Sequence, residues 1–162
     1  MKNELKKIIK TFSNNLLFIG ITEDLLEDID KNNNILNCDI LSNDAKENRK
    51  GKFFGGKSIN INKIRKKYKR KSIDYIICNY DVIFPYIRKF VKNSVYINKN
   101  KLYFYGNVDL DLIKLRYSRY NTEIDIKKYK NGYIVKVDNI KSKNNFIKEL
   151  FYSIKDIITF LI

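Results

Sequence analysis

Residues 16–41, LLFIGITEDLLEDIDKNNNILNCDIL, decide the expected fold. They begin with a short apolar run at 16–21 and end with another at 35–41, and such runs are typical of strands buried on both faces of a sheet. Between the two runs, Thr22 is a typical helix N-cap, acidic residues fill the first turn, and apolar residues recur at helical spacing. A strand, a crossover helix and a second strand form a parallel pair. We therefore predict an α/β fold built on a parallel sheet.

The alternation of strand and helix patterns continues along the rest of the chain. Apolar residues recur at the spacing of amphipathic helices in three further segments: 2–13, 85–91 and 146–162. Short apolar runs that favour strands recur in four: 57–61, 72–79, 94–97 and 102–106. A basic helix is expected to end at Lys71, and Asn131-Gly132 between two alternating segments predicts a hairpin. Together these patterns predict one three-layer Rossmann-like domain over residues 1–162, with a mainly parallel sheet, a C-terminal antiparallel hairpin and a covering helix.

The composition is that of a globular intracellular protein. With 44% hydrophobic residues in 162, the chain is long enough to bury a core without a disulfide or metal. Cys38 and Cys78 lie in apolar runs and are expected to be buried free thiols. No apolar run approaches the roughly 18 residues of a membrane span, so we expect a cytoplasmic protein. The chain has no histidine, which argues against a metal site and removes the commonest general base.

The positive charge is concentrated in one part of the chain. The net charge is +15, and residues 51–100 alone carry 13 basic and 2 acidic side chains. An AT-rich coding bias toward lysine would also raise the total, so the distribution is the more informative property. The cations expected to bind phosphates of RNA or another polyanion are Lys63, Arg65, Lys66, Lys67, Lys69, Arg70 and Lys71. Nearby aromatic and basic residues that could stack on or contact unpaired bases are Tyr68, Arg88, Lys89, Lys92, Arg116, Tyr117, Arg119 and Tyr120.

One short motif suggests nucleotide binding. Residues 51–58 read Gly-Lys-Phe-Phe-Gly-Gly-Lys-Ser and match the phosphate-loop pattern, with Gly51, Gly56, Lys57 and Ser58 at its defining positions. In such a loop, backbone N–H groups surround the phosphates, the lysine reaches them and the hydroxyl binds magnesium. The polar residues before Gly51 are unlike the buried strand that normally leads into this loop. A flexible basic loop therefore stays an alternative interpretation.

A second group of residues lies at the ends of predicted strands. Gly20 follows the first apolar run, Asp39 lies near the end of the second, and residues 74–79 read Asp-Tyr-Ile-Ile-Cys-Asn. In these features, residues 15–106 resemble the class I S-adenosylmethionine-dependent methyltransferase family. Open α/β sheets bind their ligands at the carboxyl ends of the strands, which is where these residues are expected.

The resemblance implies a cofactor and a reacting end. Gly20 and Asp39 would bind S-adenosylmethionine, Asp39 through its ribose, and Asp74 and Asn79 would be the catalytic residues. Residues 21–23 stand where the family has further glycines, so the resemblance is to a degenerate member of the family. The same residues also suit ordinary structural roles, since a glycine can form a tight turn and aspartates can cap helices or strand ends.

Three functional hypotheses remain open on the sequence. The first is methyl transfer from S-adenosylmethionine to RNA held by residues 63–71, or a methyltransferase-like domain that has lost catalysis. The second is a non-enzymatic module that binds a polyanion or nucleic acid on the same fold. The third is a nucleotide-binding protein that uses Lys57 and Ser58.

Overall fold

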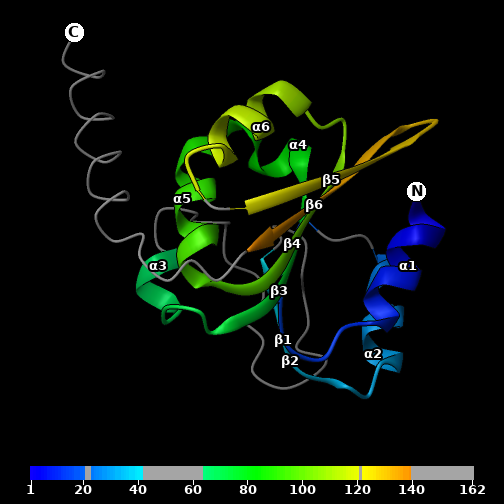
Figure 1. The fold of residues 1–162 in the computed structure, drawn as a ribbon. Helices are drawn as coiled ribbons and strands as arrows, with labels where there is room; N and C mark the ends of the chain where they lie inside the picture. The colour runs from blue at the N-terminus through cyan, green and yellow to red at the C-terminus, as the bar shows by residue number, and fades with distance from the viewer. Residues whose placement is uncertain (21–22, 42–63, 121, 140–162) are drawn as a thin grey trace, which may run out of the picture.

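Six strands form one mixed sheet in the order β2-β1-β3-β4-β6-β5. The computed structural model describes residues 1–20, 23–41, 64–120 and 122–139 (Figure 1). The strands are β1 (Asn14–Ile19), β2 (Ile35–Leu41), β3 (Ile73–Asn79), β4 (Asn98–Gly106), β5 (Thr122–Tyr129) and β6 (Gly132–Asn139). The first four run parallel to one another, and β6 is antiparallel to both β4 and β5. The chain therefore has the predicted Rossmann-like α/β fold, with a mainly parallel sheet and an antiparallel hairpin at one side.

Helices cover both faces of the sheet, which gives three layers (Figure 1). The helices are α1 (Lys2–Lys10), α2 (Glu23–Lys31), α3 (Ile64–Lys67), α4 (Tyr80–Ile83), the 3-10 helix η2 (Phe84–Tyr86), α5 (Ile87–Ile97) and α6 (Leu110–Tyr117). One apolar core packs α1 and α2 on the first face, and a larger core packs α3 to α6 on the second. Neighbouring strand residues alternate between the two cores, because successive side chains of a strand point to opposite faces.

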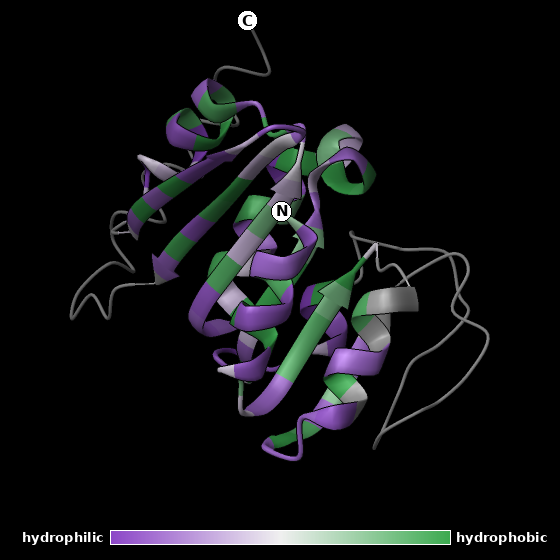
Figure 2. Cartoon of the chain, turned by 90° about the vertical axis from the view of Figure 1, so that its right-hand side faces the viewer, coloured by the Kyte–Doolittle hydropathy of each residue, from purple (hydrophilic) through white to green (hydrophobic). Residues whose placement is uncertain are grey.

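The edge hairpin is amphipathic, as its sequence pattern predicts. Along β5, exposed residues alternate with half-buried ones such as Ile124 and Ile126. Figure 2, viewed from the side of α1 and α2, shows this alternation of hydrophilic and hydrophobic bands along the hairpin. Gly132 adopts a φ of +123° at the turn, where an added Cβ would lie 2.4 Å from the carbonyl oxygen of Gly106. The Asn131-Gly132 turn is thus confirmed, and its glycine also permits a close approach to β4.

Some predicted boundaries differ from the structure. Residues 94–97 are the end of α5 rather than a strand, because Ser94 and Ile97 belong to the buried face of the helix. Asn98 is the first residue of β4, and the basic helix expected through Lys71 ends at Lys67. The predicted strand 57–61, the phosphate-loop motif and the C-terminal covering helix lie outside the described residues.

The two cysteines are buried and free, as predicted. Within the part of the chain that the structure describes, no helix is long and apolar enough to cross a membrane.

Candidate functional site

Three of the parallel strands bring Gly20, Asn79 and Tyr105 together at the carboxyl edge of the sheet. Ile19 pairs with Cys78, so Gly20 and Asn79 follow side by side, and Asn79 pairs with Tyr105 in β4. This edge is where an open α/β sheet binds its ligands, and the strand order reverses direction here between β1 and β3. It is therefore the first place to test for a cofactor site.

Gly20 is enclosed by protein atoms on two sides. Its φ of +69° lies in the left-handed region, and an added Cβ would lie 2.8 Å from Cγ2 of Val82 and 2.9 Å from Cβ of Asn79. On the other face of the sheet, the hydroxyl of Tyr105 donates a 2.5 Å hydrogen bond to the carbonyl oxygen of Gly20. Burial raises the pKa of Tyr105, so this hydroxyl stays protonated and acts as a donor. The glycine is needed here for close packing between the ends of β1 and β3.

Asn79 is also occupied by a contact within the chain. Its side-chain oxygen accepts a 3.0 Å hydrogen bond from the backbone N–H of Asp81 and so caps the start of α4. Asn is a favoured N-cap residue because its side chain satisfies one of the free N–H groups at a helix start. The structure thus places Gly20 and Asn79 together, as expected, and gives each a structural contact.

Asp39 lies deeper in the sheet than the other predicted cofactor residue. It pairs with Leu17, which in turn pairs with Ile76, and β2 continues to Leu41. Asp39 is therefore level with a residue three positions before Gly20, which corresponds to about 10 Å along the strands. The sequence placed both residues at one strand end, and the strand register separates them.

Asp39 faces the helical segment above the sheet. Burial raises the pKa of Asp39, and the neighbouring Tyr68 hydroxyl and Lys67 ammonium partly offset this effect. Burial likewise lowers the pKa of Lys67, with Asp39 acting in the opposite direction. The buried Tyr68 hydroxyl lies close enough to Asp39 to affect its pKa, but it makes no hydrogen bond of normal geometry in the described residues. Asp39 thus lies close to Lys67 of α3 and to Tyr68, the residue after it.

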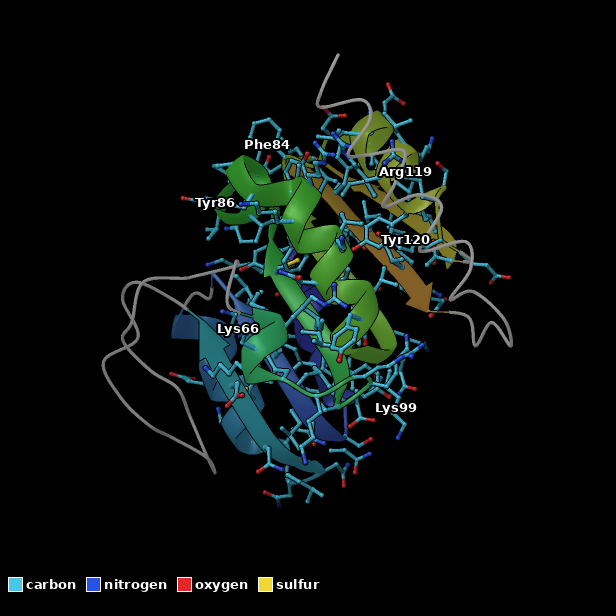
Figure 3. The ribbon with its side chains drawn as sticks, turned by 90° about the vertical axis from the view of Figure 1, so that its left-hand side faces the viewer. Lys66, Phe84, Tyr86, Lys99, Arg119 and Tyr120 are labelled. Carbon is cyan, nitrogen blue, oxygen red and sulfur yellow. The ribbon has the colours of Figure 1, made fainter. Side chains whose placement is uncertain are left out.

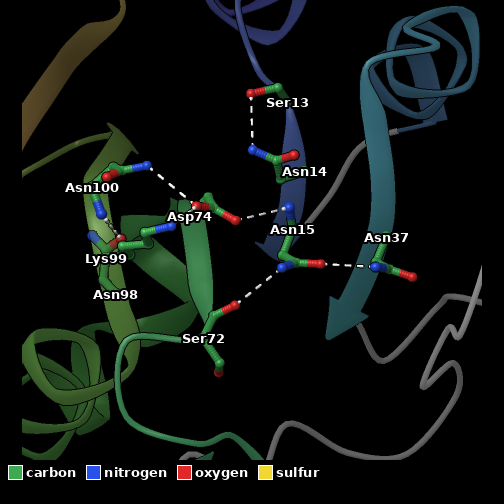
Figure 4. A network of polar contacts seen from close by, with 9 residues as sticks. All are labelled: Ser13, Asn14, Asn15, Asn37, Ser72, Asp74, Asn98, Lys99 and Asn100. Carbon is green, nitrogen blue, oxygen red and sulfur yellow. Dashed lines mark hydrogen bonds and ion pairs between the residues drawn. The ribbon is translucent and has the colours of Figure 1, made fainter.

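Asp74 lies at the opposite end of β3 from Asn79. The two residues are five positions apart along the strand, which corresponds to roughly 16 Å. The buried Asp74 carboxylate accepts hydrogen bonds from the backbone N–H of Asn15 at 3.2 Å and from the side-chain amide of Asn100 at 3.4 Å. The ammonium of Lys99 lies 3.5 Å from it (Figure 4). Asp74 therefore joins the amino ends of β1, β3 and β4, and the structure does not place it with the expected reacting end.

The described residues do not fit an S-adenosylmethionine site of the kind that the resemblance implies. Atoms of Asn79 and Val82 fill the space beside Gly20, and Asp39 is level with Leu17 rather than with the end of β1, close to Lys67 and Tyr68. A cavity between α5, α6 and the sheet has a volume of about 10 Å³, which is room for about one water molecule. No group of three or more potential metal ligands occurs in the described ranges.

A different surface carries the exposed charge. We define the basic face as the exposed side chains that the 64–71 segment and α5 present on the outer helical layer: Arg65, Lys66, Lys69, Arg70, Lys71, Arg88, Lys89 and Lys92. The two segments are held together by Arg65, whose guanidinium lies 4.1 Å from the centre of the Tyr96 ring, and by Lys71, whose ammonium donates to the carbonyl oxygen of Val95. Figure 3 views this side of the molecule, with Lys66 over α3.

The basic face contains no carboxylate of its own. Segments 64–73 and 82–108, which supply it, have no Asp or Glu. Lys66, Lys69 and Lys92 make no ion pair within the described residues, whereas Lys6, Lys127 and Lys136 elsewhere do. Five of the seven expected cations therefore lie on this face, whereas Lys67 lies close to Asp39 and Lys63 is outside the described residues.

Not all of the expected aromatic partners are accessible. Tyr68 and Tyr117 are buried, and the Tyr117 hydroxyl is 2.9 Å from the hydroxyl of Ser94. Among the described residues, the exposed aromatic rings on this side are instead Phe84 and Tyr86, at 50% and 48% exposure. The sequence patterns did not indicate these two rings, because Pro85 was assigned only to the start of a helix. A usable signal was the pair of aromatic residues on either side of Pro85, shortly before three basic residues.

Comparison with solved structures identifies the fold. A spermidine synthase in complex with the transition-state analogue AdoDATO matches with a TM-score of 0.56 and 14% identity, over 91% of this chain and 61% of that chain. The spermidine synthase from Thermotoga maritima matches with a TM-score of 0.53 and 14% identity, over 86% and 58%. This chain shares the Rossmann-like α/β fold of these two structures. It spans about three fifths of the length of the structures it matches. No protein-family profile and no curated protein matches the sequence.

Proposed function

We propose that this domain binds RNA through the basic face and that it does so without a methyl donor. The observation that supports the proposal is the set of eight exposed cations on two adjoining segments that contain no carboxylate. An array of cations binds a phosphate backbone chiefly by releasing condensed counterions, and no base needs to be recognised. RNA is the polyanion that both the methyltransferase-like and the binding-module hypotheses share.

The contacts at the carboxyl edge support the second half of the proposal. Gly20 is enclosed by Val82, Asn79 and Tyr105, and Asp39 lies close to Lys67 and Tyr68 rather than at the strand end. The sheet then serves as a rigid support for α3 and α5, the helices that carry the cations.

The test is the affinity for an oligouridylate as a function of salt. For a single strand, log K falls with log salt with a slope of about −0.7 per phosphate contact, so five contacts give a slope of about −3.5. A slope of this size supports the proposal. Salt-independent binding, or no binding at low salt by a protein that is folded by circular dichroism, would contradict it.

The catalytic alternative makes the opposite prediction about Asp39. If the domain were an active methyltransferase, calorimetry would detect S-adenosylmethionine binding, and Asp39→Ala would abolish it. The binding-module proposal predicts no heat with S-adenosylmethionine and an RNA affinity that Asp39→Ala changes little. The phosphate-loop alternative predicts magnesium-dependent ATP binding that is lost in Lys57→Ala.

A further inference from the structure

We infer that the bound RNA is single-stranded and that its bases stack on Phe84 and Tyr86; this inference rests on the proposed function. Both rings belong to η2, and about half of each side chain is exposed to solvent. Large aromatic side chains normally bury most of their surface, so two half-exposed rings in one three-residue turn require an explanation.

The backbone of η2 gives the two rings a fixed position. Pro85 lies between them and restricts the φ angle at the centre of the turn. The Phe84 ring also packs against Tyr80, with 5.7 Å between ring centres, and Tyr80 is buried in the core. The turn is thus anchored on one side while the rings remain accessible on the other. A preorganised aromatic surface loses little conformational entropy when a base stacks on it.

The aromatic rings and the cations are parts of one continuous surface. η2 leads directly into α5, whose first turn carries Arg88 and Lys89, and Lys92 follows one turn later. The other end of α5 contacts Arg65 and Lys71 of the 64–71 segment. Figure 3 shows Phe84 and Tyr86 on the same side of the molecule as Lys66. Bases and phosphates of one strand could therefore be bound at the same time.

The dimensions of this surface suit a short single strand. The eleven residues of α5 span about 16 Å. At the spacing of about 3.4 Å per phosphate that one strand has in duplex DNA, this length faces at most about five phosphates, and a more extended single strand presents fewer. Asp81 carries the carboxylate nearest to Phe84 in the sequence. Its Oδ2 would lie 3.1 Å from a Cβ added at Gly106, so the carboxylate is directed to the edge of the sheet. A duplex would offer the same phosphates, but its stacked bases would not be available to Phe84 and Tyr86.

The absence of tryptophan from the chain allows a direct test. Phe84→Trp places the only indole at the proposed stacking site, and Leu36→Trp places one at a 64% exposed position on β2 as the matched control. Oligouridylate is expected to quench the fluorescence of the Phe84→Trp variant and not that of the control. Inorganic polyphosphate of similar charge has no bases, so it should bind without quenching either variant.

A second variant separates stacking from apolar contact. Phe84→Leu with Tyr86→Leu keeps apolar side chains but removes the flat rings, and it should lower the affinity for oligouridylate at least about fivefold. Its affinity for polyphosphate and for duplex RNA should stay the same. The stacking inference would be overturned if the double leucine variant kept its affinity for oligouridylate and the Phe84→Trp variant showed no quenching. Binding of polyphosphate in that case would still uphold the proposed function. If the unmodified protein binds neither polyphosphate nor RNA, the proposed function itself fails.

Discussion

The hydroxyl of Tyr105 in β4 donates a 2.5 Å hydrogen bond to the carbonyl oxygen of Gly20 at the end of β1. The two residues are 85 positions apart, and β3 lies between their strands. This bond ties together the end of the sheet where a Rossmann-like protein would bind its ligand. The contribution of this bond to the free energy of unfolding therefore tests whether this edge of the sheet is packed for stability.

Tyr105→Phe removes only this hydroxyl. We expect a loss of about 1 kcal/mol in the free energy of unfolding, because a partly buried carbonyl loses its donor. Urea titration followed by circular dichroism measures the change. Tyr129→Phe is the control, since the hydroxyl of Tyr129 makes no hydrogen bond among the described residues, and it should change stability by less than about 0.5 kcal/mol. Equal stabilities of both variants and the unmodified protein would argue against the bond.

Gly20→Ala should be considerably more destabilising. The added Cβ meets Val82 and Asn79 at less than 3.0 Å, and the φ of +69° is unfavourable for any residue with a Cβ. Together these effects predict a loss of about 2–4 kcal/mol. The double variant Gly20→Ala with Val82→Ala removes one of the two clashes and should recover part of that loss. A Gly20→Ala protein as stable as the original would instead indicate open space beside Gly20, as a cofactor site requires.

Asp39→Asn tests the burial of the carboxylate by its pH dependence. The folded state raises the pKa of Asp39, mainly through burial. A raised pKa stabilises the folded protein fully below the unfolded value of about 3.9, and this contribution is lost as the pH rises through the folded pKa. The variant should therefore be the more stable protein at pH 7, by less than about 1 kcal/mol because the carboxyl is only half-buried. The difference should shrink toward pH 4; a difference that grows on acidification would contradict this assignment.

Asp74→Ala separates a structural role from a catalytic one. The buried carboxylate accepts two hydrogen bonds and faces Lys99, so its removal should cost about 1–3 kcal/mol in unfolding free energy. RNA affinity of the folded variant should not change. The matched control is Asp81→Ala, because Asp81 is exposed and should cost less than about 0.5 kcal/mol. If Asp74→Ala left stability intact but abolished a reaction with S-adenosylmethionine, Asp74 would be catalytic after all.

The sequence patterns were sufficient to predict most of the fold. The limits of β2 were predicted without error, because the run 35–41 lies between a helix stop of three asparagines and a polar segment. The end of α5 could not be predicted, since Val95 and Ile97 favour a strand by local propensity and packing in the core keeps them helical. Helix α6 was missed, although Asp109 as its N-cap was a usable signal.

The candidate site was harder to predict, because it depends on relationships between strands. Asp39 was predicted at a strand end, and only the pairing of β2 with β1 shows that it lies level with Leu17. Asp74 and Asn79 share one strand, but a five-residue separation places them at opposite ends of it. No periodicity in a single sequence reports the register of non-adjacent segments. The location of the cations was predictable, since they are contiguous along the chain.

RNA binding by the basic face is tested most directly by comparing two triple variants. Lys66→Gln, Lys69→Gln and Arg70→Gln remove three charges from the basic face, whereas Lys10→Gln, Lys128→Gln and Lys130→Gln remove three from exposed positions on α1 and the hairpin. We predict that the first variant loses oligouridylate affinity about tenfold or more and that its salt slope falls by about 2, while the second changes little. Equal losses in the two variants would show that only the total charge matters, and would contradict a binding surface formed by the 64–71 segment and α5.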